Sequence, residues 1–327
     1  MIDWYTLLVP VAVFAMLLLF RFVGCNFGGP MTSQLYANDV LEDNPVVYYR
    51  MQEKPGADIA HDETGFLNAQ YGVADGIHTL PILSGSDAAT YFSLPIAAPS
   101  IQLAAPSIML KHPDDTSVRF NGSFVSANGS LKDLSHFTVD ALVRPEWDIA
   151  NERNFYCVID HSNFVPGLGA PGPTRNAGFA IYGGPDNPLN ATSPICWQLW
   201  IGTGVEFARA NPLDGGPGPL VTAEDTYLAV QFDDTQAFLW AYTHKVDLDL
   251  VRYEVFRRPY VQATDPDPTR LPLRVGISGS FAGLFGPFPS PQGFIYPFVG
   301  RIAEVAVYNT VLDQARIISH IMNAFNT

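Results

Sequence analysis

The stretch "FVGRIAEVAVYNTVLDQARIISHIMNAF", residues 298–325, begins with a strand pattern and ends with a helix pattern. Its first part, residues 298–308, is apolar on both faces apart from Arg301 and Glu304. Such a pattern is typical of a strand that is covered on both sides. We therefore expect it to run through the middle of a β-sandwich, with a partner for its acid, because a buried lone charge is costly.

The second part of the stretch predicts a short terminal helix. Ile317, Ile321 and Phe325 recur every fourth residue and form one apolar stripe. Asp313 stands just before this run, where a helix N-cap is expected, because a carboxylate there can accept hydrogen bonds from the first free backbone N–H groups. We expect this helix to lie across one edge of the sandwich.

The composition favours an all-β chain. The 327 residues include 27 Gly and 27 Pro, and 13% of them are aromatic, which suits many strands joined by turns. Residues 137–146 alternate between apolar and polar side chains, as a half-buried strand does. Residues 226–245 indicate a hairpin around the turn sequence "DDT". No compositional seam divides the body of the chain, so we expect one large domain over residues 44–327.

Four stretches, in order along the chain, resemble the laminin G-like, concanavalin A-like jelly-roll family. They are "NPVVYYRMQEKPGADIAHDETGFLNAQYG" (44–72), "SVRFNGS" (117–123), "FTVDALVRPE" (137–146) and "FVGRIAEVAVYNTVLDQARIISH" (298–320). The first contains the family's Asp-x-Ser/Thr-Gly turn, and the third has Leu142 where Trp is usual. The resemblance implies two antiparallel sheets packed as a jelly roll, with the first and last strands paired. It is compatible with sugar binding, adhesion or a structural role.

The net charge of −14 argues against a nucleic-acid partner, which needs clustered Lys and Arg. It favours cations as guests, although acidic side chains also serve solubility. Asp247, Asp249 and Glu254 come nearest to the carboxylate pair of a glycosidase, yet only the two Asp share a face of an extended strand. No metalloprotease, nucleophile-elbow or phosphate-loop motif is present in the sequence. We expect no enzyme activity.

The N-terminus predicts contact with a membrane. Residues 4–20 are apolar apart from Thr6, a length near the lower limit for spanning a bilayer. Three interpretations stay open for residues 1–24: a cleaved secretory signal, a lipoprotein signal with lipidation at Cys25 in "FVGC", and a retained anchor helix. We expect the β domain to lie outside the cytoplasm, in the periplasm or at a surface, although Arg21 alone would favour the opposite orientation of a retained anchor. Residues 25–43 lack periodicity and predict a linker.

The other two cysteines leave two alternatives. Cys157 and Cys196 both lie in strand-like runs. They form either a disulfide, which an exported domain can keep, or two buried thiols.

Calcium is the sharpest cofactor hypothesis, because lectin-like jelly rolls often hold this ion. Asp62 and Glu63 in the turn after the first strand, and Glu304 in the last strand, supply carboxylates that calcium prefers. The competing explanation gives Glu304 an ion pair with Arg50 or Arg301. We favour the ion pair, since Arg50 in the first strand and Arg301 in the same strand are both near enough in the expected fold to pair with it.

Aromatic side chains provide the candidate ligand-binding surface. The loop 281–298 is rich in them, and its candidate ligand-binding residues are Phe285, Phe288, Phe294 and Tyr296. Aromatics on a loop must pack beneath it, face a ligand or lie in a subunit interface. Trp197, Trp200 and Trp240 lie in strands, and core packing is the better interpretation for them.

Together these features predict a membrane-tethered, extracytoplasmic module that binds a glycan or a protein surface. The alternative is a structural subunit of a surface appendage or virion, assembled as a homo-oligomer through its N-terminal hydrophobic helix. Periodic assembly would support the second hypothesis, and saturable glycan binding by a monodisperse domain would support the first.

Overall fold

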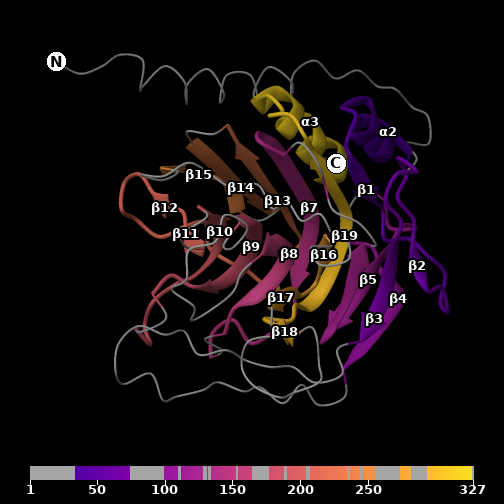
Figure 1. Cartoon of the computed structure of the whole chain (residues 1–327), viewed down its shortest axis with the longest axis horizontal. Coiled ribbons are helices and arrows are strands. Elements are labelled where there is room, and N and C mark those ends of the chain that lie inside the picture. Colours follow the sequence, from indigo (N-terminus) through magenta and orange to yellow (C-terminus); the bar gives the residue numbers. More distant parts are fainter. Residues whose placement is uncertain are drawn as a thin grey trace. The chain divides into compact units, whose positions relative to one another are not determined.

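The computed structural model describes most of the chain after residue 33. The described ranges are 34–73, 99–109, 112–127, 131, 134–151, 154–163, 177–187, 190–203, 207–233, 236–243, 246–254, 273–280 and 293–325. They form two antiparallel sheets with a pair of helices on the outside of one sheet (Figure 1). This architecture is the predicted jelly-roll sandwich.

Sheet A has the order β12-β15-β14-β13-β7-β19-β5-β4, and β1 also pairs with β19. Its strands are β1 (Val47–Tyr49), β4 (Ser100–Pro106), β5 (Thr116–Asn121), β7 (Phe137–Pro145), β12 (Asn211–Pro212), β13 (Thr226–Phe232), β14 (Gln236–Thr243), β15 (Val246–Glu254) and β19 (Val299–Tyr308).

Sheet B has the order β11-β10-β9-β8-β16-β6-β3-β2. Its strands are β2 (Ile59–Ala60), β3 (Ala69–Val73), β6 (Ser123–Ala127), β8 (Tyr156–Asn163), β9 (Ala177–Pro185), β10 (Ile195–Gly202), β11 (Phe207–Arg209) and β16 (Arg274–Val275). A separate hairpin joins β17 (Ser278–Ser280) to β18 (Gly293–Ile295) and contacts β8.

The closing strand β19 lies in the middle of sheet A, as its two apolar faces predict. It pairs with β7 and β5, and its C-terminal half also pairs with β1 in the register Val47↔Val307. The pairing of first and last strands is therefore confirmed. The hairpin prediction is also confirmed, because β13 and β14 pair in register and the backbone N–H of Gln236 donates to the Asp233 carboxylate.

The main core fills the space between the sheets. Each sheet contributes one row of side chains, because successive residues of a strand point to opposite faces. Across the sandwich, Phe137 of β7 stacks on Phe179 of β9 with ring centroids 4.5 Å apart, and Phe232 of β13 stacks beside it. These contacts leave the second face of each sheet to be covered by other elements or by solvent.

Helices α2 (Gln34–Glu42) and α3 (Gln314–Phe325) cover the outer face of sheet A. The expected stripe of α3 is buried there, and the backbone N–H of Arg316 donates to Asp313 at 2.9 Å, which confirms the N-cap. Two expectations are wrong. The helix α3 covers a face of the sheet rather than an edge, and α2 occupies the second half of the predicted linker. Tyr36 and Val40, four residues apart, give α2 the apolar face that packs there.

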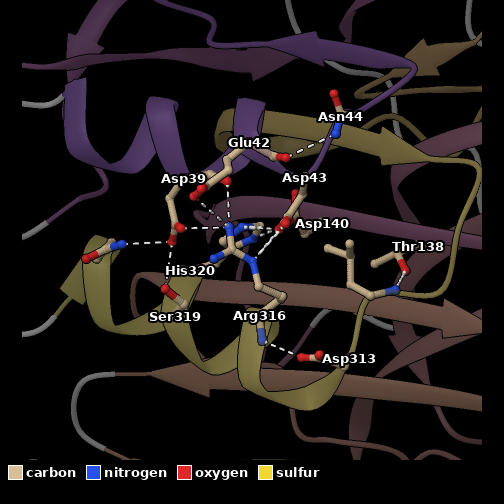
Figure 2. Close-up of polar contacts among 12 residues, drawn as sticks. Asp39, Glu42, Asp43, Asn44, Thr138, Asp140, Asp313, Arg316, Ser319 and His320 are labelled. Carbon is tan, nitrogen blue, oxygen red and sulfur yellow. Dashed lines mark hydrogen bonds and ion pairs between the residues drawn. The ribbon is translucent and has the colours of Figure 1, made fainter.

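A polar network joins the two helices (Figure 2). The Arg316 guanidinium pairs with Asp39 and Asp43 at 2.7 Å each. The buried imidazole of His320 lies between two carboxylates, with Nδ1 2.9 Å from Asp140 of β7 and Nε2 3.1 Å from Asp43. Because each ring nitrogen faces a carboxylate oxygen, the arrangement is best satisfied by a protonated imidazole.

Candidate binding surface on sheet B

The predicted calcium residues each have protein partners. The buried carboxylate of Asp62 accepts five hydrogen bonds of 2.6 to 3.0 Å, from four backbone N–H groups and the Thr64 hydroxyl. Asp62 thereby ties the turn to β1, and Glu63 beside it is exposed. Within the described ranges, no three His, Cys, Asp or Glu side chains gather in a way that could hold a metal ion. Calcium binding stays a prediction.

Glu304 is fully buried and has the predicted ion pair. The Tyr48 hydroxyl and the Gln52 amide donate to its carboxylate, and Nε of Arg50 lies 3.5 Å from it. Arg301 pairs instead with Glu146. Burial raises the pKa of Glu304 to about 7, although Arg50 and the Tyr48 hydroxyl act in the opposite direction. The residue sits at a bulge of β19 with a positive φ of 53°, a conformation uncommon outside glycine.

The alternative in which Cys157 and Cys196 form a disulfide is wrong. Cys157 and Cys196 are buried and are not joined to each other. They lie on β8 and β10, and β9 runs between these strands. Two inter-strand spacings of about 4.8 Å place their Cα atoms beyond the span of a disulfide. The two buried thiols are the alternative that the structure supports.

The predicted ligand-binding aromatics are only partly described. Phe285 and Phe288 lie outside the described residues, as does Cys25, and Phe294 is described by its backbone in β18. Tyr296 follows β18, and its carbonyl accepts a hydrogen bond from the backbone N–H of Cys157 in β8. This bond holds the end of the aromatic loop beside β8.

One cross-strand row runs over the whole outer face of sheet B. From β11 to β2 it is Arg209, Trp200, Ala180, Asp160, Arg274, Ser126, Gln70 and Ile59, each beside the next in the register. Its members Ala180, Asp160 and Arg274 are buried, whereas both ends of the row are at least partly exposed. At the β11 end, Trp200 and Arg209 lie side by side.

Trp200 belongs to an aromatic cluster on this face. It packs edge to face against Phe155 and Tyr182, at centroid distances of 6.0 and 6.1 Å, and Tyr296 makes the same kind of contact with both of these rings. Phe155 and Tyr182 are buried, whereas Trp200 and Tyr296 are partly exposed. The cluster thus has a packed floor and two aromatic side chains that reach solvent.

Core packing is confirmed for Trp197 and Trp240, which are 0% and 2% exposed. Trp200 differs because strand alternation turns it away from Trp197, onto the outer face. That alternation was visible in "CWQLWIG", where Trp197 and Trp200 are three residues apart and so point to opposite faces. This alternation is the sequence signal that distinguishes the buried Trp197 from the partly exposed Trp200.

Hydrogen bonds fix the orientation of the Trp200 ring. Its indole N–H donates to the Gln198 side-chain oxygen at 3.1 Å. The amide nitrogen of Gln198 donates in turn to the carbonyl oxygens of Gly184 and Pro185, at 3.2 and 2.9 Å. Because a fixed side chain loses little conformational entropy when a ligand binds, the Trp200 ring is preorganised as a contact surface.

The two Arg side chains of the row are paired with acids. The guanidinium of Arg209 donates to the backbone carbonyl and the carboxylate of Asp186, at 2.6 and 2.5 Å. Arg274 pairs with Asp160 at 3.3 Å, and both are buried. The Nε–H of Arg209 has no hydrogen-bond partner among the described residues. Because this nitrogen is buried, the described surface near Trp200 offers an aromatic ring and a charge-balanced ion pair, but no accessible spare donor.

No helix in the described part of the chain is long and apolar enough to cross a membrane. The predicted membrane segment, residues 4–24, lies outside that part.

No family model and no curated protein matches the sequence. Among solved structures, the chain is similar to domain 4 of AbnA, a GH43 extracellular arabinanase from Geobacillus stearothermophilus in complex with arabinotriose. The match has 14% identity over 84% of this chain and 97% of that chain, with a TM-score of 0.45. The Ruminococcus gnavus IT-sialidase CBM40 bound to α2,3 sialyllactose matches with 15% identity over 57% and 82%, with a TM-score of 0.37.

The binding domain of botulinum neurotoxin serotype D also matches, with 12% identity over 85% of this chain and 52% of that chain and a TM-score of 0.39. At such low identities and TM-scores, the ligands of these proteins are not transferred to this chain.

Proposed function

We propose that this chain is a membrane-tethered, extracytoplasmic binding module that recognises a glycan through the outer face of sheet B and catalyses no reaction. The observation that carries the proposal is the partly exposed Trp200 ring, held in one orientation beside Arg209. Residues 4–24 supply the tether in this proposal, on the strength of their apolar sequence.

The chemistry of this surface suits a sugar. An aromatic ring that is partly in water lends its face or edge to the apolar C–H groups of a sugar, and the desolvation of both surfaces favours the contact. Binding pockets typically combine apolar contact with a few fixed polar groups, and the partly exposed Arg209–Asp186 pair provides them here.

The test is binding of the purified β domain with its preceding residues to an oligosaccharide panel, measured by titration calorimetry. The panel includes arabinotriose and α2,3-sialyllactose, with which the matched domains were crystallised. We expect saturable binding of at least one glycan, and a loss of about tenfold or more in affinity for Trp200→Ala. Phe66→Ala is the control, because Phe66 is an exposed aromatic (69%) in the turn between β2 and β3 at the opposite edge of sheet B.

Equal affinities of wild type and Trp200→Ala would refute the proposed surface. Failure of every glycan to bind would refute glycan recognition.

The tether is tested separately from the ligand. Intact mass spectrometry of protein purified from native membranes distinguishes an unprocessed chain from one that begins at an acylated Cys25. Recovery of the full-length chain in the aqueous phase, without lipid or detergent, would contradict the tether. Recovery in a large ordered particle would favour the structural-subunit alternative, for which the apolar run of residues 4–20 is the supporting observation.

A further inference from the structure

We propose that Asp186 is a specificity-determining residue that restricts the Trp200 surface to neutral glycans by occupying the guanidinium of Arg209. The inference rests on the proposed function and adds the charge class of its ligand. It concerns one ion pair whose members come from different parts of the chain: Arg209 from the edge strand β11, and Asp186 from the residue that follows β9.

The geometry places the pair directly at the candidate site. Arg209 is the register partner of Trp200. Its Nη1 donates to the backbone carbonyl of Asp186 and its Nη2 to the carboxylate of the same residue, so one residue engages both terminal nitrogens. The backbone N–H of Asp186 bonds to the carbonyl of Pro194, which anchors the acid from its other side. The guanidinium therefore cannot turn freely toward a ligand.

Proteins commonly bind a carboxylate through a bidentate pair of N–H donors on one edge of an Arg guanidinium. At this site that edge is already filled, because Asp186 takes both terminal nitrogens. A glycan carboxylate that approached the Arg209 guanidinium beside Trp200 would meet the Asp186 carboxylate, and like charges at short range repel in a partly desolvated site. The other Arg of the row, Arg274, is buried and paired with Asp160, so it offers no substitute.

Neutral sugars avoid this conflict. A hydroxyl or ring oxygen carries no charge for Asp186 to repel, and the buried Nε–H of Arg209 gives a carboxylate no second donor edge. The net charge of −14 adds a long-range repulsion of anionic ligands, which salt screens. The pair with Asp186 acts at short range and persists in salt, so the two effects separate experimentally.

The experiment compares lactose with α2,3-sialyllactose, which adds one carboxylate-bearing sugar, by titration calorimetry at about physiological salt. Wild type is expected to bind lactose more tightly than sialyllactose. Asp186→Asn keeps the shape of the side chain but removes its charge, so the Arg209 guanidinium is no longer neutralised and can attract a ligand carboxylate. We expect this variant to gain about tenfold or more in affinity for sialyllactose, the equivalent of one charge-assisted hydrogen bond, with little change for lactose.

Asp58→Asn is the matched control. It makes the same change in net charge at an exposed residue next to β2, at the far edge of sheet B, and is expected to behave as wild type. Preferential binding of sialyllactose by wild type, or no gain for Asp186→Asn in a protein that binds lactose, would overturn the role of Asp186 alone. Absence of binding to both sugars by every variant would overturn this inference, and the failure of the whole panel would overturn the proposed function too.

Discussion

Replacing Glu304 with Gln removes a carboxyl group that folding carries out of water. The side chain is fully buried under the donors of Tyr48, Gln52 and Arg50, and burial raises its pKa from the ordinary 4.5 to about 7. Gln has the same shape and can still accept a hydrogen bond from the Tyr48 hydroxyl. The substitution therefore removes the titration while it preserves most of the packing.

The sign follows from proton binding. Between pH 4.5 and about 7 the folded protein holds a proton on Glu304 that the unfolded chain has released, so the free energy of unfolding falls as pH rises through this window. The two pKa values differ by about 2.5, which corresponds to about 3 kcal/mol of stability lost across the window. For Glu304→Gln this contribution is absent.

The assay is urea-induced unfolding of wild type and variant at steps between about pH 4 and pH 8. The difference between the two free-energy curves removes the contributions of all other titrating groups. We expect wild type to lose about 3 kcal/mol relative to Glu304→Gln between the ends of the range. Glu63→Gln, at an exposed neighbouring position, serves as the control and should follow wild type. Parallel curves for wild type and Glu304→Gln would refute the buried-acid account.

Three further perturbations test other parts of the account. Gly184→Ala would bring a Cβ atom to 2.3 Å from Cδ1 of Phe155. We expect the free energy of unfolding, measured in urea, to fall by about 1–3 kcal/mol. A variant as stable as wild type would show that the aromatic cluster is packed more loosely than described. Asp313→Ala removes the N-cap of α3 and should cost about 1 kcal/mol, detected as a lower midpoint in the same assay. The His320 imidazole lies against the Asp140 carboxylate (Figure 2). Burial lowers the pKa of His320, but the hydrogen bond and charge of Asp140 outweigh burial and leave this pKa above its usual value. His320 therefore stabilises the fold at low pH, and this stabilisation is lost as pH rises above 6.5. His320→Gln should lack that decline, and an unchanged pH profile of unfolding would contradict the protonated pairing.

The sequence predicted the centre of the fold well because its signals there are local and strong. Strand β19 is apolar on both faces and α3 has a regular stripe with an N-cap, so pattern alone located both. The partner of Glu304 followed from a general rule, since a buried acid needs a cation. The family resemblance pairs the first strand with the last, and Arg50 comes directly after the first strand.

Other features escaped sequence reasoning for physical reasons. Helix α2 is short, and its apolar residues become meaningful only against α3 and sheet A, because so short a helix is not stable alone. The disulfide was excluded by the strand order, because β9 intervenes between the two cysteines, and strand order is not a local property. The Arg209–Asp186 pair likewise joins residues from separate strands whose neighbourhood depends on the register of sheet B.

The measurement that tests the central claim most directly is a nuclear magnetic resonance titration of the isotope-labelled domain with a glycan that binds in the panel. The Trp200 indole N–H signal is assigned by comparison with Trp200→Phe. The account predicts that this signal and the backbone signals of Gln198 and Arg209 shift in a saturable manner, with the same affinity as calorimetry. Saturable shifts confined to other surfaces, such as the turn around Phe66, would contradict it.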